Sequence, residues 1–359
     1  MTKITIKGAY GETNFGDDLL MCVFENFFLK EFENVQLNFV GDYNDYVQNL
    51  LVNSTYLEPN FLPDWEVYGG GTQFFAFQNK YDTSLLKKIN VALRNPSLIK
   101  SKIKNIFTKN IINQSKIAFL GFGIGPFYEN QVAILNAKEK ISKAEFVGVR
   151  DEVSNQYCTD WNIPATLGAD VVFSSYFTKV ELKTTTDRQP KKKIGIIVRD
   201  WNWEESGKNY INNLIGFYKS YSNVELQFII FAPSKDKDWI LKTKNEKVLI
   251  WDPIKYSIKS FLEELNEFDG FISARYHGAI VAALLQKPVI CVEVEPKLKI
   301  LTEQVKEIKL WEKPFDIKML EKLVGQLNYD IDYGDTLKER KLKADFMLLD
   351  FAKRYNEIK

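Results

Sequence analysis

Short apolar runs alternate with helix-length segments along this chain, and the alternation occurs twice. The runs are rich in β-branched and aromatic residues, which is typical of buried strands joined by crossover helices. The first set occupies residues 3–7, 35–40, 65–68, 117–120 and 145–149. The second set occupies residues 194–198, 225–231, 248–250, 270–272 and 288–292. The pattern predicts an α/β protein with two Rossmann-like domains, each built on a doubly wound parallel sheet.

A polar segment separates the two sets. Residues 183–193 contain a proline, several lysines and no aliphatic or aromatic residue, a composition that favours a linker. We therefore expect an N-terminal domain over residues 1–182 and a C-terminal domain over residues 194–330. Within residues 331–359, leucine and phenylalanine recur at roughly helical spacing, which predicts a terminal helix packed on the body. Function is expected in the cleft between the carboxyl ends of the two sets of strands.

The charge balance and the rare residue types exclude several classes of function. The 359 residues include 48 lysines and arginines against 47 aspartates and glutamates, whereas dedicated nucleic-acid binders carry a basic excess. The three cysteines lie far apart without a CxxC pair, which excludes a zinc ribbon. The single histidine, His277, excludes any mechanism that needs two. With neither a signal-peptide pattern nor an apolar run of about 18 residues, we expect a cytoplasmic protein.

A glycine-rich turn follows the first predicted strand and leads into an apolar helix. The turn contains three glycines, the last of them Gly16, and Asn14 or Asp17 is placed to cap the helix. Glycines before a helix N-terminus suit an anion or a sugar, although a capped turn alone has the same pattern. Asp17 and Asp18 would repel a phosphate but suit a sugar hydroxyl, as hydrogen-bond acceptors or as a base.

Two further glycine loops follow predicted strands. Three consecutive glycines at residues 69–71 precede Thr72, and Gly123 lies in an alternating GxGxG segment. Consecutive glycines at a strand end cost backbone entropy, so a phosphate or sugar cradle explains them better than packing does. A tight turn has a similar sequence, and GxGxG alone is a weak signal.

Arginines lie at the ends of three predicted strands. Arg150 and Arg199 each precede an aspartate, and Arg275 belongs to the segment SARYHG before an apolar helix. An arginine fork suits a phosphate or a carboxylate, and the neighbouring His277 can act as an acid near neutral pH. A lone histidine is more often structural, but the position of His277 beside Arg275 at a strand–helix junction favours a functional role.

Taken in order, these junctions resemble the polysaccharide pyruvyl transferase family. The matching segments are NFGDDLL at residues 14–20, YGGGTQF at 68–74, GFGIGP at 121–126, VRDEVS at 149–154, LGADVVF at 167–173 and SARYHGAIVAALLQKPVI at 273–290. Each segment is weak alone, whereas the ordered set is specific. The resemblance implies a GT-B-like fold, in which two Rossmann-like domains face each other across a cleft. It also implies transfer of pyruvate from phosphoenolpyruvate onto two sugar hydroxyls, which forms a cyclic ketal and releases phosphate.

Roles for individual residues follow from the resemblance together with the chemistry of the junctions described above. His277 is expected to be the general acid or a phosphate clamp, and Asp17 or Asp18 to deprotonate the acceptor. The residues expected to bind phosphoenolpyruvate are Arg150, Arg199, Arg275, Gly278 and either Lys297 or Lys299. Those expected to bind the acceptor sugar are Asn14, Gly16, Gly70, Gly71, Thr72 and Gly123. Phosphoenolpyruvate is a co-substrate in this scheme, and neither a metal nor a resident cofactor is expected.

Residues 84–116 form a basic stretch with apolar residues interleaved. No acidic residue lies between Asp82 and Glu129. A basic amphipathic segment can lie on an anionic membrane surface, where a lipid-linked acceptor would be carried. We expect the stretch either to dock the protein at the inner face of the membrane or to be a surface insertion solvated by its lysines.

Two other functions fit much of the same pattern. The first is a metal-independent GT-B glycosyltransferase, but such enzymes commonly hold a nucleotide sugar with an acid, and none lies between Arg275 and Pro288. The second is a non-catalytic sugar- or phosphate-binding protein on the same fold. Trp201 and Trp203 follow a predicted strand end and are candidates to stack on a sugar, although tryptophans more often pack in cores.

Overall fold

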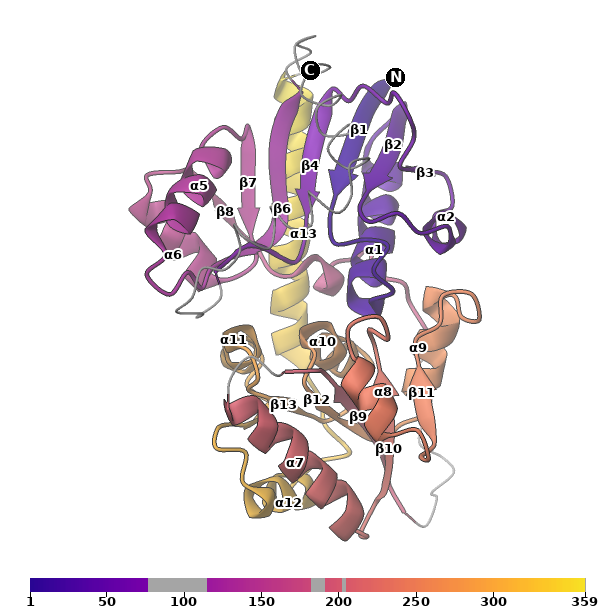
Figure 1. The fold of residues 1–359 in the computed structure, drawn as a ribbon. Coiled ribbons are helices and arrows are strands. Elements are labelled where there is room, and N and C mark those ends of the chain that lie inside the picture. The colour runs from indigo at the N-terminus through magenta and orange to yellow at the C-terminus, as the bar shows by residue number, and fades with distance from the viewer. Residues whose placement is uncertain (77–114, 182–190, 202–204, 359) are drawn as a thin grey trace, which may run out of the picture.

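The chain folds into two parallel sheets, and the predicted α/β fold is confirmed. The computed structural model describes residues 1–76, 115–181, 191–201 and 205–358. Figure 1 shows one sheet above the other, with helices packed against both. Every pairing between the described strands is parallel, so the crossover helices must return each strand to the same end of its sheet.

The first sheet has eight strands, in the order β3-β2-β1-β4-β6-β7-β8, with β5 paired to β6. Its strands are β1 (Thr2–Lys7), β2 (Val35–Val40), β3 (Thr55–Tyr56), β4 (Trp65–Gly69), β5 (Thr72–Phe74), β6 (Lys116–Ile124), β7 (Phe146–Val149) and β8 (Thr166–Leu167). The associated helices are α1 (Phe15–Glu31), α2 (Tyr46–Leu50), α5 (Gln131–Ile141), α6 (Glu152–Asp160) and the short 3₁₀-helix η1 (Val171–Phe173). The strand order reverses between β1 and β4, which places a ligand crevice at their carboxyl ends.

The second sheet has six strands, in the order β11-β10-β9-β12-β13-β14. Its strands are β9 (Lys193–Val198), β10 (Glu225–Ile230), β11 (Val248–Ile250), β12 (Gly270–Ser273), β13 (Val289–Val292) and β14 (Lys309–Trp311). The associated helices are α7 (Glu205–Ser220), α8 (Lys237–Lys242), α9 (Ile258–Asn266), α10 (Tyr276–Leu284), α11 (Pro296–Gln304) and α12 (Ile317–Gly325). Here the order reverses between β9 and β12, which makes a second crevice.

The last helix, α13 (Gly334–Ile358), leaves the second sheet and packs against the first. In Figure 1 it is the long yellow helix behind β4 and β6. Its Phe351 is fully buried against Trp65 and Phe146 of the first sheet, and Asp345 accepts a 2.7 Å hydrogen bond from the backbone N–H of Ser175. The C-terminal segment therefore ties the two sheets together.

Helix α1 makes a second connection between the sheets at its first residue. The backbone N–H of Phe15 donates to the carbonyl of Phe231 at 2.9 Å. Its ring packs on Phe231 and Trp251, which follow β10 and β11 of the second sheet, and on Phe261 of α9, with centroids 4.8 to 5.1 Å apart. Burial of one such side chain contributes about 1.5–3 kcal/mol. The glycine-rich turn before α1 is thus fixed at the boundary between the two sheets.

Several element boundaries differ from those predicted. Strand β9 begins at Lys193, inside the expected linker, and residues 183–190 of that linker lie outside the described residues. Helix α13 begins at Gly334, whereas the sequence predicts the amphipathic pattern only from Thr336. The sequence does not predict β3, β5, β8 and β14, whose two or three residues form no uninterrupted aliphatic run. The equally short β11 is predicted because its three residues are all aliphatic.

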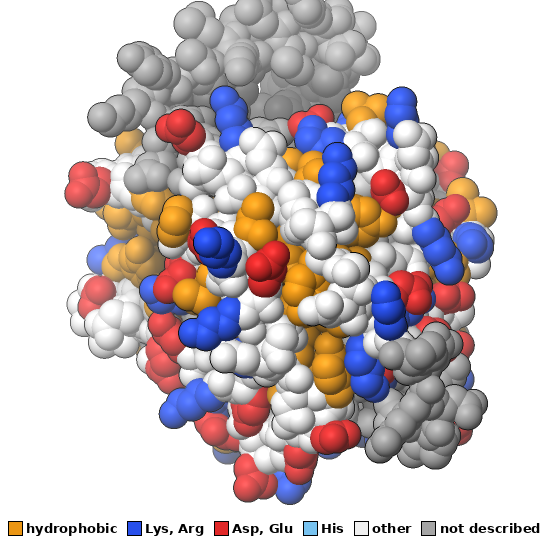
Figure 2. Space-filling model, turned by 90° about the horizontal axis from the view of Figure 1, so that it is seen from below, with side chains coloured by type: hydrophobic (Ala, Val, Ile, Leu, Met, Phe, Trp, Pro, Cys, Tyr) orange, Lys and Arg blue, Asp and Glu red, His pale blue; other side chains and the backbone are white. Residues whose placement is uncertain are grey.

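Charged side chains of both signs are intermixed on one face of the molecule. The face seen from below in Figure 2 carries lysines and arginines among aspartates and glutamates, with no broad patch of one sign among its described side chains. On this face the described side chains therefore do not form the basic stripe that is typical of a protein that binds a phosphate backbone. None of the described helices is both long and apolar enough to span a bilayer.

Candidate active site

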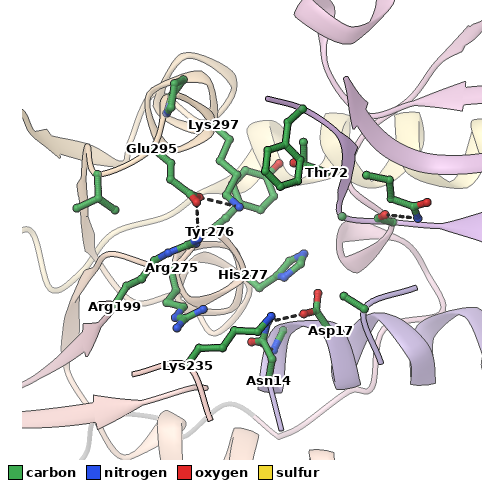
Figure 3. Close-up of a pocket in the computed structure, with 18 of the residues that line it drawn as sticks. Asn14, Asp17, Thr72, Arg199, Lys235, Arg275, Tyr276, His277, Glu295 and Lys297 are labelled. Atoms are coloured by element: carbon green, nitrogen blue, oxygen red, sulfur yellow. Dashed lines mark hydrogen bonds and ion pairs between the residues drawn. The ribbon is translucent and has the colours of Figure 1, made fainter. Parts of the chain in front are cut away.

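A pocket of about 790 Å³ lies where the carboxyl ends of the two sheets meet. The turns after β1 and β4 contribute residues from the first sheet, and the turns after β9 and β12 contribute residues from the second. Figure 3 shows side chains from both sheets converging on it. Its lining includes Asn14, Gly16, Asp17, Gly70, Gly71, Thr72, Arg150, Arg199, Trp201, Lys235, Arg275, Tyr276, His277, Glu295 and Lys297. The structure thus brings most of the predicted site residues together.

The turn before α1 forms one wall of the pocket. Asn14 caps the helix, because its side-chain oxygen accepts from the N–H of Gly16 at 3.3 Å. Its amide group donates to the carboxylate of Asp17, which faces the pocket. A Cβ at Gly16 would lie 2.5 Å from Nδ1 of His277. Glycine is therefore required there so that the imidazole can lie against the start of α1.

The glycine loop after β4 forms the adjoining wall. Gly70 and Gly71 have φ angles of +66° and +70°, a conformation that side chains other than glycine disfavour. The next residue, Thr72, accepts a hydrogen bond from Nη2 of Arg150 at 2.9 Å. The loop therefore presents open backbone to the pocket and a hydroxyl that orients an arginine.

Arg199 and Lys297 share one carboxylate on the opposite wall. Nη2 of Arg199 lies 2.5 Å from Oε1 of Glu295, and Nζ of Lys297 lies 2.7 Å from its Oε2. Burial opposes ionisation of Glu295, but the two cations outweigh it and hold the pKa of the carboxyl at about 2. Burial lowers the pKa of both Arg199 and Lys297. Two cations on one anion leave a net positive charge, which favours an anionic ligand.

Arg275 lies at the start of α10, and its guanidinium is held in place by an aspartate. It is 7% exposed, and its Nη2 lies 2.5 Å from both carboxylate oxygens of Asp236. Its Nε donates to the carbonyl of Val198 at 3.4 Å. The guanidinium is thus held rigidly beside the helix N-terminus, where backbone N–H groups also favour anions.

His277 lies in the first turn of α10 and contacts an aspartate of the other sheet. Its Nε2 is 3.5 Å from Oδ2 of Asp170, which also accepts from Nη1 of Arg150 at 3.2 Å. The guanidinium of Arg150 lies 4.6 Å from the ring centroid of Tyr276. This network crosses the boundary between the sheets at the residue best suited to move a proton.

Four predicted site residues do not line the pocket. Asp18 is fully buried behind it, bonded to Tyr46 and Trp251, so the prediction that it acts directly on the acceptor is wrong. Lys299 lies two residues beyond Lys297 in α11 and is exposed outside the pocket. The other two make room for neighbours: a Cβ at Gly123 would lie 2.9 Å from Nη2 of Arg150, and one at Gly278 would lie 2.6 Å from Oγ of Ser273.

Four side chains that line or support the pocket were not predicted from the sequence. Asp170 lies in the segment LGADVVF, which marks a motif without revealing what its aspartate contacts. Glu295 lies two residues before Lys297, a spacing from which an ion pair between the two could have been predicted. Asp236 and Lys235 lie in a polar loop that carries no motif. Lys235 pairs with Glu12 of the first sheet at the edge of the pocket.

Trp201 lines the pocket with its ring 5.1 Å from the guanidinium of Arg199. Trp203 and residues 84–114 of the basic stretch lie outside the described residues. The expectations of a stacking Trp203 and of a membrane-docking segment therefore remain predictions.

The sequence model of the family described as polysaccharide pyruvyl transferase matches residues 14–296. The match covers most of the chain and includes Asn14, Asp170, Arg275 and His277. No curated protein matches the chain. The chain belongs to the polysaccharide pyruvyl transferase family, whose members are transferases of polysaccharide biosynthesis.

Solved structures with the same fold cover nearly the whole chain. The UDP-bound MnaA of S. aureus is 12% identical with a TM-score of 0.60, covering 100% of this chain and 98% of its own. The UDP-GlcNAc 2-epimerase of Methanocaldococcus jannaschii is 14% identical with a TM-score of 0.58, covering 98% and 100%. That of Neisseria meningitidis, bound to UDP-GlcNAc, is 13% identical with a TM-score of 0.54, covering 99% and 100%. These similarities confirm the GT-B-like fold.

Proposed function

We propose that this member of the polysaccharide pyruvyl transferase family transfers pyruvate from phosphoenolpyruvate onto two hydroxyls of a sugar acceptor. The product is a cyclic ketal in a cell-surface glycan or its precursor, and phosphate is released. The observation that carries the proposal is the convergence of Arg199, Arg275 and Lys297 at the N-terminus of α10. His277 lies in the first turn of that helix. The site therefore offers anion-binding groups beside a single proton donor.

The cationic wall suits both charged groups of phosphoenolpyruvate. Its phosphate and its carboxylate each require cationic or N–H partners. Arg199 and Lys297 lie on one side of α10 with Glu295 between them, and Arg275 lies at its start. A pocket of about 790 Å³ is within the range of pockets that hold whole small ligands, so the donor leaves room for sugar units beside the α1 wall.

The proposed reaction proceeds through two additions at C2 of the donor. A sugar hydroxyl attacks C2 while His277 delivers a proton to the methylene carbon C3, and the carboxylate of Asp17 receives the hydroxyl proton. Phosphate then leaves with the C–O bonding pair, which makes C2 electrophilic again. The second hydroxyl attacks C2 and gives its proton to His277, which the first addition left unprotonated, and this closes the ketal. The proton held by Asp17 leaves with the phosphate, so both residues return to their starting states. Phosphoenolpyruvate is the co-substrate, and the scheme calls for no resident cofactor.

The location of the reaction follows from the acceptor. We propose a cytoplasmic enzyme that meets a growing glycan, either free or on a lipid at the inner face of the membrane. In the second case residues 84–116 would contact anionic lipid.

Lys297→Ala should abolish stabilisation by phosphoenolpyruvate, whereas Lys299→Ala should retain it. Both lysines lie on α11, but only Lys297 lines the pocket. At about 100 times its dissociation constant, phosphoenolpyruvate should add about 2.7 kcal/mol to the free energy of unfolding of the wild type. Thermal unfolding with phosphoenolpyruvate, and separately with UDP, measures the effect.

The ligand comparison separates the proposal from its main alternative. Stabilisation by phosphoenolpyruvate that is lost only in Lys297→Ala supports the donor assignment. Stabilisation by UDP alone would instead favour a nucleotide-sugar transferase, since structural neighbours of this fold bind UDP or UDP-GlcNAc.

A further inference from the structure

The imidazole of His277 is held by groups of the other sheet. Helix α10, which carries His277, belongs to the second sheet, whereas Asp170 precedes η1 beside the first. Nε2 of His277 lies 3.5 Å from Oδ2 of Asp170, and Nδ1 lies against Gly16 at the start of α1. The side chain of His277 is 12% exposed and that of Asp170 is fully buried. No other acidic group is paired with the imidazole among the described residues.

Asp170 is bound on every side by donors. Its Oδ1 accepts from the N–H of Val172 at 3.1 Å, and its Oδ2 accepts from Nη1 of Arg150 at 3.2 Å. Burial opposes ionisation, but His277 and Arg150 outweigh it and hold the pKa of Asp170 below its usual value. The group is therefore a fixed carboxylate whose Oδ2 accepts from Arg150 and also lies 3.5 Å from the buried Nε2 of His277, for which the described residues offer no closer hydrogen-bond partner.

We propose that Asp170 is the positioning residue for His277, and that it acts from one sheet on a residue of the other. A carboxylate that accepts from Nε2–H fixes both the ring orientation and the tautomer of a histidine. Nε2 then keeps its proton, and Nδ1 is the nitrogen that gains and loses one. The role in catalysis rests on the proposed function, whereas the tautomer of His277 does not.

The arrangement makes the acid depend on the contact between the sheets. Asp170 also holds Arg150, whose other nitrogen reaches Thr72 in the glycine loop. Separation of the two sheets would remove the carboxylate and Gly16 from His277 together. The positioned acid therefore exists only when the α1 wall and the cationic wall face each other, as they do in this structure.

The single histidine of the chain makes the tautomer directly measurable. In protein labelled with ¹⁵N-histidine and titrated until the ring is neutral, the ring nitrogen shifts should report an Nε2–H tautomer in the wild type. In Asp170→Ala no acceptor from the described residues faces Nε2, so the Nε2–H proton should lose its downfield shift and its protection from solvent exchange. Asp345→Ala is the control, because Asp345 anchors the same loop at Ser175 without contact to His277.

An Nε2–H tautomer with a downfield, slowly exchanging proton in the wild type and in Asp345→Ala, and loss of both features in Asp170→Ala, supports the proposal. An Nδ1–H tautomer in the wild type would overturn it, even if Asp170→Ala failed to fold. The same shift and the same exchange rate in all three proteins would overturn it as well. Asp170→Ala should also lower the rate of phosphate release by about 10–100-fold, as loss of an outer-shell partner typically does. If the wild type has the expected tautomer but releases no phosphate from phosphoenolpyruvate, the positioning role of Asp170 stands and the proposed function is refuted.

Discussion

His277→Gln is expected to lower the rate of phosphate release from phosphoenolpyruvate by about 10²–10⁴-fold, the contribution typical of general acid catalysis. Glutamine keeps a polar side chain of similar reach but cannot deliver a proton to C3. The imidazole is the one group in the first turn of α10 that lies against both Asp170 and Gly16. Phosphate release in the presence of lipid-linked, nucleotide-linked and polymeric sugars measures the loss.

The same variant separates the two roles open to His277. If the histidine is the acid, stabilisation by phosphoenolpyruvate should persist in His277→Gln while turnover falls. If it is a phosphate clamp, stabilisation and turnover should fall together. An unchanged rate of phosphate release would contradict either role, provided that the thermal unfolding midpoint without ligand stays near that of the wild type.

Asp18→Asn is expected to stabilise the protein at pH 8 and to have little effect at pH 5. Asp18 is fully buried and accepts hydrogen bonds from Nε1 of Trp251 at 2.8 Å and from the hydroxyl of Tyr46 at 3.0 Å. Burial outweighs these donors and raises the pKa of the carboxyl from 3.8 to about 7. The folded state therefore resists ionisation that the unfolded chain undergoes freely.

The sign of the pH dependence follows from the difference between the pKa of Asp18 in the folded protein and its pKa in the unfolded chain. Well below pH 3.8 the carboxyl is protonated in both states and does not change the free energy of unfolding. As the pH rises toward 7, the unfolded chain ionises first, so this group progressively lowers the free energy of unfolding. A difference of three pKa units lowers the free energy of unfolding of the wild type by about 4 kcal/mol above pH 7. Asparagine avoids this loss but leaves amide hydrogens unpaired, so Asp18→Asn should raise the free energy of unfolding at pH 8 by about 2–4 kcal/mol.

Urea unfolding at pH 5 and pH 8 tests this prediction. Asp335→Asn is the control, because that side chain is 99% exposed and should change little at either pH. An equal difference between Asp18→Asn and the wild type at both pH values would contradict the buried, weakly acidic carboxyl. A destabilised Asp18→Asn at pH 8 would do the same.

The adjacent aspartates show where prediction from the sequence ends. Consecutive residues of a helix point about 100° apart, so Asp17 faces the pocket and Asp18 faces the interior. The sequence predicts the helix, its cap and two acids at its start, because these depend on local pattern. Which acid is buried depends on Trp251 and Tyr46, which lie on other elements.

The same reasoning explains the remaining differences. The long strands were predictable because their apolar residues recur over five or more positions, as in β1 and β9. The arginines and His277 were predictable because strand ends of such sheets carry function. Asp236 and Asp170 were not predictable. Each becomes part of the site only through the arginine that it pairs with in the fold, and that arginine is distant in the sequence. Gly123 and Gly278 looked like ligand loops, but they accommodate Arg150 and Ser273 instead.

The transfer of labelled pyruvate tests the central claim most directly. The enzyme would be incubated with phosphoenolpyruvate labelled with ¹³C at C2 and with candidate sugar acceptors, and both products would be followed. We predict a labelled ketal carbon on the sugar and one phosphate released per label transferred. Transfer of a sugar from a nucleotide donor, with no label moved from phosphoenolpyruvate to any acceptor, would contradict the claim.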